Sequence, residues 1–127
     1  LDLDETLIHY VDNGPESYFL VRPFCKEFLI EMSKYYEIVI FTAGVQEYAD
    51  WALLIDPEGK IKHRLYREHT VVTDKERAAI IENIKKEEGG TASGNISVPL
   101  ILKDLSKIGR PIDKTIIVDN IADNFLL

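Results

Sequence analysis

The chain has 127 residues, of which 46% are apolar and 29% charged, and its formal net charge is −7 at pH 7. This length suits one globular domain, while the acidic balance argues against binding the phosphates of nucleic acids or of anionic membranes. The apolar runs are far shorter than the roughly 20 residues that span a bilayer, and the single cysteine, Cys25, excludes a disulfide framework. The acidic balance thus predicts no nucleic-acid or membrane partner. We also expect an intracellular protein of the nucleus or cytoplasm that acts as a monomer.

Strands and helices are predicted to alternate, which is typical of an α/β fold with a parallel sheet. Pro23 suits the first turn of a helix, whose apolar stripe would be Phe24, Phe28, Leu29 and Met32. The other elements expected in the first half are a strand end at Leu1–Leu3, a polar turn at Asp12–Pro15, an extended piece at Ser17–Val21, a buried strand at Ile38–Phe41 and a helix at Gln46–Ile55.

The second half continues the same alternation. Thr73–Glu76 reads "TDKE", a capping box that begins a third helix, and Gly89 and Gly90 end it. Strands are predicted at Thr70–Val72, Pro99–Leu102 and Lys114–Val118. We expect residues 1–127 to form a single domain core cut from a longer protein at both ends, with a helix-plus-loop insertion at 73–98.

Polar side chains follow several of the predicted strands, at the edge where open α/β sheets collect ligands and catalytic groups. They are Asp2, Asp4 and Thr6 after the first strand, Thr42 after the second, Lys103 after the third, and Asp119 and Asn120 after the last. If these strand ends cluster, the site holds three carboxylates, two hydroxyls, an ammonium and an amide.

This set of groups indicates phosphoryl transfer. One carboxylate can attack phosphorus and form an aspartyl-phosphate, and a second can protonate the leaving oxygen and later take a proton from water. Mg²⁺ prefers a few hard oxygen ligands together with waters and phosphate oxygens. A lysine and a hydroxyl can offset the charge on the remaining phosphoryl oxygens.

Five stretches of the chain carry a family resemblance, and they read "DLDETLIH", "YYEIVIFTAGVQEYAD", "DPEGKIKHRLYRE", "LKDLSKIGR" and "IIVDN". Together they resemble the haloacid dehalogenase superfamily, and more closely its branch of small carboxy-terminal-domain phosphatases, the NLI-interacting-factor-like enzymes. The resemblance covers nearly the whole chain. The resemblance implies a Rossmann-like parallel sheet with flanking helices, and a Mg²⁺-dependent phosphatase. Its substrates would be phosphoserine or phosphothreonine proteins, such as the tail of RNA polymerase II.

The resemblance also implies a role for each matching residue. Asp2 would be the nucleophile and a metal ligand, and Asp4 the general acid and base, with its backbone carbonyl on the metal. Thr42 would hydrogen-bond the phosphoryl group, and Lys103 would neutralise it and orient Asp2. Three further positions would support the site, namely Thr6, Arg22 and Tyr48. The metal site would be completed by Asp119 and Asn120.

Two departures from the family pattern bear on specificity. The segment before Arg22 is short, which puts recognition of the polymerase tail in doubt, and the 73–98 insertion replaces what is usually a brief turn. No stretch of the sequence is long enough for a full cap domain, so an open site suited to a protein loop or tail is expected. The alternatives are a small-molecule phosphatase, a phosphotransferase and a non-catalytic adaptor with the same fold.

Overall fold

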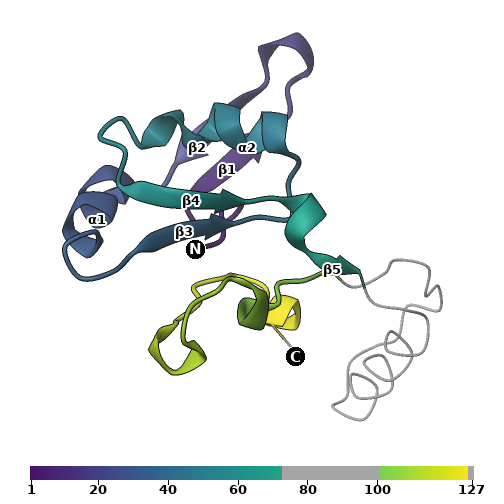
Figure 1. Ribbon diagram of the computed structural model, residues 1–127. Coiled ribbons are helices and arrows are strands. Elements are labelled where there is room, and N and C mark those ends of the chain that lie inside the picture. The colour runs from purple at the N-terminus through teal and green to yellow at the C-terminus, as the bar shows by residue number, and fades with distance from the viewer. Residues whose placement is uncertain (73–100, 126–127) are drawn as a thin grey trace, which may run out of the picture.

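A parallel pair of strands, β3 (Ile38–Phe41) and β4 (Ile61–Leu65), lies at the middle of the fold (Figure 1). The computed structural model describes residues 1–72 and 101–125, and all structural statements below concern those residues. The predicted strand at Ile38–Phe41 is confirmed, and its apolar run fits its burial, since Ile38, Ile40 and Phe41 are all buried.

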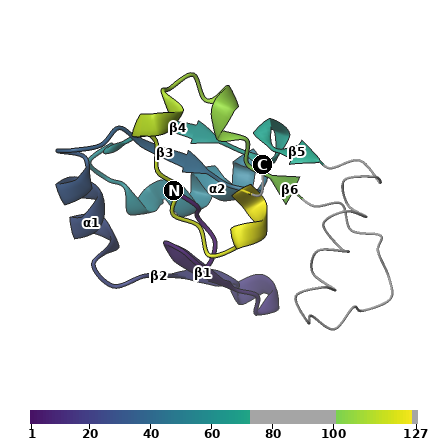
Figure 2. The ribbon, with the colours of Figure 1, turned by 90° about the horizontal axis from the view of Figure 1, so that it is seen from below.

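The first residues extend this parallel sheet. The backbone nitrogen of Leu1 donates to the carbonyl of Val39 at 2.8 Å, and the N–H of Phe41 donates to the carbonyl of Leu1 at 2.8 Å. This alternation of donor and acceptor around one residue is the parallel pattern. On the other side, the N–H of Asp2 donates to the carbonyl of Val118 at 2.9 Å. The N-terminus thus runs between β3 and the C-terminal segment (Figure 2).

The predicted final strand at Lys114–Val118 is wrong. A 3₁₀ turn occupies Ile112–Lys114, and residues 115–118 form no regular strand. A strand needs a run of backbone bonds to a neighbour, whereas within the described ranges this segment shares with residues 1–3 only the Asp2–Val118 bond. Ile116 is 66% exposed, so its apolar side chain does not reflect a buried strand face.

A β-hairpin leads away from the N-terminal strand end. Its strands, β1 (Ile8–Val11) and β2 (Tyr18–Val21), pair antiparallel, with Ile8 opposite Val21. The predicted polar turn between them is confirmed: Ser17 Oγ donates to the carbonyl of Gly14 at 2.6 Å and also lies 3.1 Å from Asp12 Oδ1. Neither β1 nor β4 was expected from the sequence, because each has only one buried residue, Ile8 and Ile61 respectively.

Two helices flank the sheet, and one of them starts later than expected. α1 (Cys25–Met32) begins two residues after Pro23, because Phe24 adopts a left-handed backbone with φ of 65°. This sets the phase of the helix, so that Cys25 and Leu29 face the core while Phe24 is 79% exposed and Phe28 40%. The predicted stripe is therefore wrong at both phenylalanines.

The second helix agrees with its prediction in extent. α2 (Gln46–Ala52) continues into a 3₁₀ turn at Leu53–Ile55, which together match the expected helix at Gln46–Ile55. Its buried side chains are Ala49, Ala52 and Leu53. Small alanines at this face let the helix lie close to the sheet.

A third strand pair carries the chain back toward the centre. β5 (Val71–Val72) pairs antiparallel with β6 (Ile101–Leu102), with Val71 opposite Leu102. Each is the C-terminal part of a predicted strand, Thr70–Val72 for β5 and Pro99–Leu102 for β6. The predicted third helix, the 73–98 insertion, and residues 99 and 100 lie outside the described residues.

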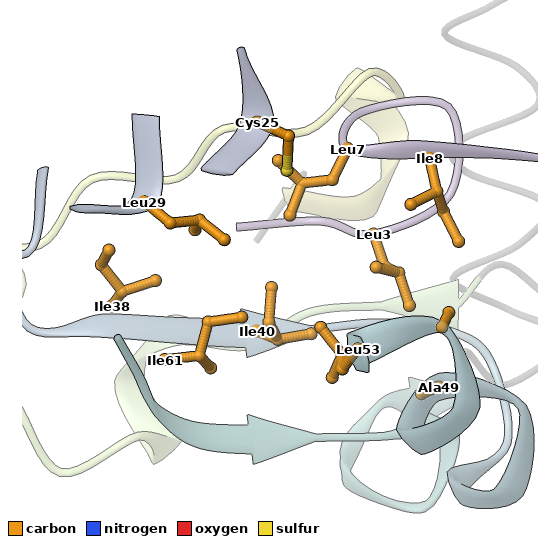
Figure 3. Close-up of a cluster of buried hydrophobic side chains, with 11 residues drawn as sticks. Leu3, Leu7, Ile8, Cys25, Leu29, Ile38, Ile40, Ala49, Leu53 and Ile61 are labelled. Carbon is orange, nitrogen blue, oxygen red and sulfur yellow. The ribbon is translucent and has the colours of Figure 1, made fainter. Parts of the chain in front are cut away.

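One apolar core joins these elements (Figure 3). Side chains from both helices, from β3 and β4, and from the N-terminal loop meet in it: Leu3, Leu7, Ile8, Cys25, Leu29, Ile38, Ile40, Ala49, Ala52, Leu53 and Ile61. A mixed α/β arrangement with a parallel strand pair and flanking helices is compatible with the predicted fold class.

Candidate active site

Lys103 is the centre of a buried charged cluster. It directly follows β6 and is only 1% exposed. Its Nζ donates to Oδ1 of Asp2 at 2.9 Å and to Oδ2 of Asp119 at 2.6 Å, while its backbone N–H donates to the carbonyl of Asn124 at 2.6 Å. Lys103 thus contacts two other predicted site residues, Asp2 and Asp119. Asp2 and Lys103 are separated by 101 positions in the sequence.

Two carboxylates share this one ammonium, which leaves the cluster with a net negative charge. Burial raises the pKa of Asp2, aided by the neighbouring Asp119 charge, and the hydrogen bond from Lys103 only partly offsets it. Burial also acts to raise the pKa of Asp119, but the hydrogen bonds from Lys103 and from the N–H of Ile121 outweigh it and lower the pKa overall. Asp2 is therefore the carboxylate whose charge is less well compensated.

A tight loop begins directly after Asp2 and carries Asp4 away from the sheet. The carbonyl of Leu3 accepts hydrogen bonds from the N–H groups of Thr6, Leu7 and Ile8 at 2.9–3.3 Å, which reverses the chain within five residues. Thr6 Oγ1 then lies 3.1 Å from Oδ2 of Asp2 and donates to it. With Lys103 on Oδ1, both oxygens of Asp2 are held in place.

One residue of this loop has an unfavourable backbone conformation. Glu5 has φ of 62°, a conformation that L-residues other than glycine rarely adopt. Arg22 supports the loop from outside: its Nε donates to the carbonyl of Thr6 at 2.6 Å and its Nη2 to that of Glu5 at 3.4 Å. Arg22, predicted as a supporting residue, therefore contacts the loop backbone beside the cluster.

Asp4 has a different partner from Asp2. Its Oδ1 accepts a short hydrogen bond from the hydroxyl of Tyr48 on α2. Burial and this bond raise the pKa of Tyr48 well above its usual value, so the phenol keeps its proton and acts as the donor. The two aspartates therefore have different partners: Asp2 is bound by Lys103 and Thr6, and Asp4 is bound by Tyr48.

Thr42 lies at the end of β3 and is fully buried. Its N–H donates to the carbonyl of Leu65 at 2.9 Å, and its Oγ1 accepts from the N–H of Gly44 at 3.0 Å. Arg67 holds the same loop, since its Nε donates to the carbonyl of Ala43 at 2.8 Å and its N–H to that of Gly44 at 2.9 Å. Because Leu1 is bonded to β3 at Phe41, this strand end lies beside that of Asp2.

Asn120 is exposed beside Asp119, while Asn124 contacts the lysine cluster directly. Asn120 lines a cavity of about 460 Å³ together with Thr6, Arg22 and Asp119. The Nδ2 of Asn124 lies 3.3 Å from Oδ2 of Asp119 and donates to it. Sequence reasoning missed Asn124 and also the contact of Arg67 with the loop after Thr42; the repeated pair in "DNIADN" is the signal that could have indicated Asn124.

The oxygen donors of this region suit a hard divalent cation. Within residues 1–72 and 101–125, no three acidic, histidine or cysteine side chains are grouped to hold a metal, but Mg²⁺ usually takes only one or two carboxylates besides waters and phosphate oxygens. Asp2 and Asp119, joined by Lys103, supply two carboxylates with an uncompensated charge, and Asn120 adds an amide beside Asp119. The chemistry of the donor set therefore fits Mg²⁺.

Comparison with known sequences decides the family. The profile of the NLI interacting factor-like phosphatases matches residues 1–127, the whole chain. The chain belongs to this family. Within the haloacid dehalogenase superfamily it falls in the branch of small carboxy-terminal-domain phosphatases, which confirms the resemblance drawn from its motifs.

Individual relatives are similar to nearly all of the chain. "CTD small phosphatase-like protein 2" of Dictyostelium discoideum is 35% identical over 98% of the chain and 21% of the relative. The human "CTD small phosphatase-like protein" is 33% identical over 99% of the chain and 43% of the relative. The mouse "Carboxy-terminal domain RNA polymerase II polypeptide A small phosphatase 2" is 31% identical, with coverages of 99% and 44%.

The chain spans less than half the length of these relatives. Within the described part of the chain, no helix is both long and apolar enough to cross a membrane.

Proposed function

We propose that this chain is the catalytic core of a Mg²⁺-dependent phosphatase that removes phosphate from phosphoserine or phosphothreonine in proteins. One observation carries the proposal: the buried ammonium of Lys103 joins the carboxylates of Asp2 and Asp119, next to the strand end that bears Thr42. A positive group and a held carboxylate at one point are what transfer of a phosphoryl group to an aspartate requires.

In the first step, a carboxylate oxygen of Asp2 attacks phosphorus and forms an aspartyl-phosphate. The bond from phosphorus to the serine or threonine oxygen breaks, and that oxygen takes a proton from Asp4. Lys103 and Thr6, which hold the two oxygens of Asp2 in the free protein, orient the nucleophile. Thr42 Oγ1 accepts from Gly44, which leaves its own proton to donate to a phosphoryl oxygen.

In the second step, water attacks phosphorus and the bond between phosphorus and Asp2 breaks. Asp4, deprotonated by the first step, takes a proton from that water, so inorganic phosphate leaves and both aspartates return to their starting states. The Mg²⁺ ligands would be the carboxylates of Asp2 and Asp119, the backbone carbonyl of Asp4 and the amide oxygen of Asn120. When bound, the ion supplies positive charge that offsets the charge of the phosphoryl group.

The family supports the proposed substrate class. The names of the relatives refer to phosphatases of a carboxy-terminal domain, in one case that of RNA polymerase II. We infer a phosphorylated protein segment as the substrate, which the polymerase tail would satisfy, in the nucleus or cytoplasm.

The test replaces the proposed nucleophile without changing its shape. Asp2→Asn should abolish Mg²⁺-dependent hydrolysis of p-nitrophenyl phosphate and of a phosphoserine peptide, because an amide cannot form the aspartyl-phosphate. Asp113→Asn, which removes an exposed carboxylate from the Ile112–Lys114 turn, is the matched control and should retain activity. Full activity in Asp2→Asn would overturn the mechanism, and preference for a panel of phosphorylated metabolites over peptides would overturn the substrate class.

A further inference from the structure

The hydroxyl of Tyr48 donates a hydrogen bond to one of the two carboxyl oxygens of Asp4, the residue assigned above as the general acid and base. The bond joins residues 44 positions apart and comes from α2, a helix with two fully buried alanines, Ala49 and Ala52. A tyrosine hydroxyl has one proton to donate, and here the donated proton lies on Oδ1. Tyr48 thus connects a residue of the N-terminal loop to a rigid element.

Packing fixes the ring that presents this hydroxyl. Tyr10 of β1 meets the Tyr48 ring edge to face, with centroids 5.7 Å apart and planes at 89°, and Trp51 lies 6.2 Å away at 55°. On the remaining side, a Cβ added to Gly44 would come within 3.2 Å of Cδ1 of Tyr48. Contacts from β1, from α2 and from the loop after β3 therefore leave the ring little freedom.

We propose that Tyr48 is a positioning residue, whose hydroxyl holds Oδ1 of Asp4 so that Oδ2 carries the proton that is transferred. This deepens the proposed function and depends on it. Oδ1 can accept from Tyr48 whether or not Asp4 is protonated, since a carboxylic acid keeps one carbonyl oxygen. The bond therefore persists through both steps and fixes which oxygen faces the leaving group.

The effect of losing the Tyr48 hydroxyl depends on how strongly the leaving group requires a proton from Asp4. The serine oxygen leaves as a strongly basic alkoxide unless it is protonated, whereas p-nitrophenolate leaves readily without a proton. General acid catalysis contributes about 10²- to 10⁴-fold, and a misplaced acid loses part of that factor. Losing the Tyr48 hydroxyl should therefore slow phosphoserine cleavage far more than p-nitrophenyl phosphate cleavage.

The experiment measures kcat/KM of Tyr48→Phe for a phosphoserine peptide and for p-nitrophenyl phosphate, with Mg²⁺ present. We expect a loss of about 10- to 100-fold on the peptide and of less than about 3-fold on the aryl phosphate. The parameter kcat/KM covers only the steps up to formation of the aspartyl-phosphate, so the second step does not affect it. Asp4→Asn should show the same substrate pattern, and the double variant should lose little beyond Asp4→Asn alone.

Tyr10→Phe is the matched control, because it removes a hydroxyl from the neighbouring ring and keeps the ring contact with Tyr48. Its ratio of the two kcat/KM values should equal that of the wild type. This ratio is measured on one enzyme sample, so a partly unfolded variant lowers both values equally and leaves the ratio unchanged.

Equal losses on both substrates in Tyr48→Phe, or no loss on the peptide, would overturn the role of Tyr48. Failure of the proposed function gives a different result, namely a wild type without Mg²⁺-dependent hydrolysis or a fully active Asp2→Asn.

Discussion

Lys103 is a buried charge whose removal has a cost that can be estimated. Its ammonium is the cation shared by Asp2 and Asp119, whose side chains are 9% and 0% exposed. A charge placed in a low-dielectric interior is tolerated only when it is paired and hydrogen-bonded. The same residue that the proposed mechanism needs for charge neutralisation therefore also supports the fold.

Lys103→Met should lower the free energy of unfolding by about 3–5 kcal/mol, because it leaves two buried carboxylates facing each other without a cation. Urea denaturation followed by circular dichroism measures this change. Adding Asp119→Asn to the variant should recover part of the loss, since one of the two charges is then gone. The control is Lys107→Met, at an exposed position, which should change stability by no more than about 0.5 kcal/mol. A loss below about 1 kcal/mol for Lys103→Met would contradict the buried-charge description.

At the scale of elements, the N-terminal loop and the segment after the hairpin depend on each other. The Arg22 guanidinium donates to the carbonyls of Glu5 and Thr6, and the Arg22 N–H donates to the carbonyl of Leu7 at 2.8 Å. These bonds support the left-handed backbone of Glu5, a conformation that costs free energy and would destabilise a loop without them. Arg22 thus supports the backbone of the loop that follows Asp2 and Asp4.

Arg22→Ala should loosen this loop more than it destabilises the protein. We expect a loss of about 1 kcal/mol in unfolding free energy and a fall of about 10-fold in kcat/KM, because small displacements of catalytic groups are costly. Arg22→Lys should restore activity only in part, since an ammonium lacks the planar fork of a guanidinium. Arg64→Ala, which removes a half-exposed pair with Asp50, serves as the control and should keep full activity. An unchanged kcat/KM in Arg22→Ala would contradict the positioning role.

At the scale of the whole molecule, one exposed ion network joins three segments that are distant in sequence. Oε1 of Glu37, just before β3, lies 2.7 Å from Nη2 of Arg110 and 3.1 Å from Nε2 of His63 on β4, and Oε2 accepts from Nε of Arg110 at 3.1 Å. Hydrogen bonding from Arg110 holds the pKa of Glu37 below its ordinary value of 4.5. The network fastens the C-terminal segment to the parallel strands.

The pH dependence of this network has a definite sign. Because the pKa of Glu37 is lower in the folded protein than in the unfolded chain, its contribution is complete above about pH 4.5 and is lost as the pH falls further. The melting temperature of Glu37→Gln should therefore lie below that of the wild type near neutral pH, and the two should converge as the pH falls below about 4.5. Salt should also reduce the difference, since the groups are exposed. A difference that grows toward acid would contradict the assignment.

Much of the candidate site was predictable from residue types and their order. Asp2, Thr42 and Lys103 were chosen because each follows a predicted strand, and strand ends of parallel sheets gather at one edge. The buried strand at Ile38–Phe41 was predictable because a continuous apolar run has few other uses in a chain of this size. The separate partners of Asp2 and Asp4 were not predictable, because they depend on how the loop after Leu3 turns.

The sequence by itself determined the alternating α/β character, the polar set at the strand ends and membership of the phosphatase family, because all three are carried by local patterns and by motifs. Only the tertiary structure decided that Lys103 joins Asp2 to Asp119, that Tyr48 holds Asp4, and that Asn124 contacts Asp119 while Asn120 faces outward. It also decided that Lys114–Val118 is not a strand. Such pairings span up to 101 residues, and they follow from packing and backbone register, which no local stretch of sequence encodes.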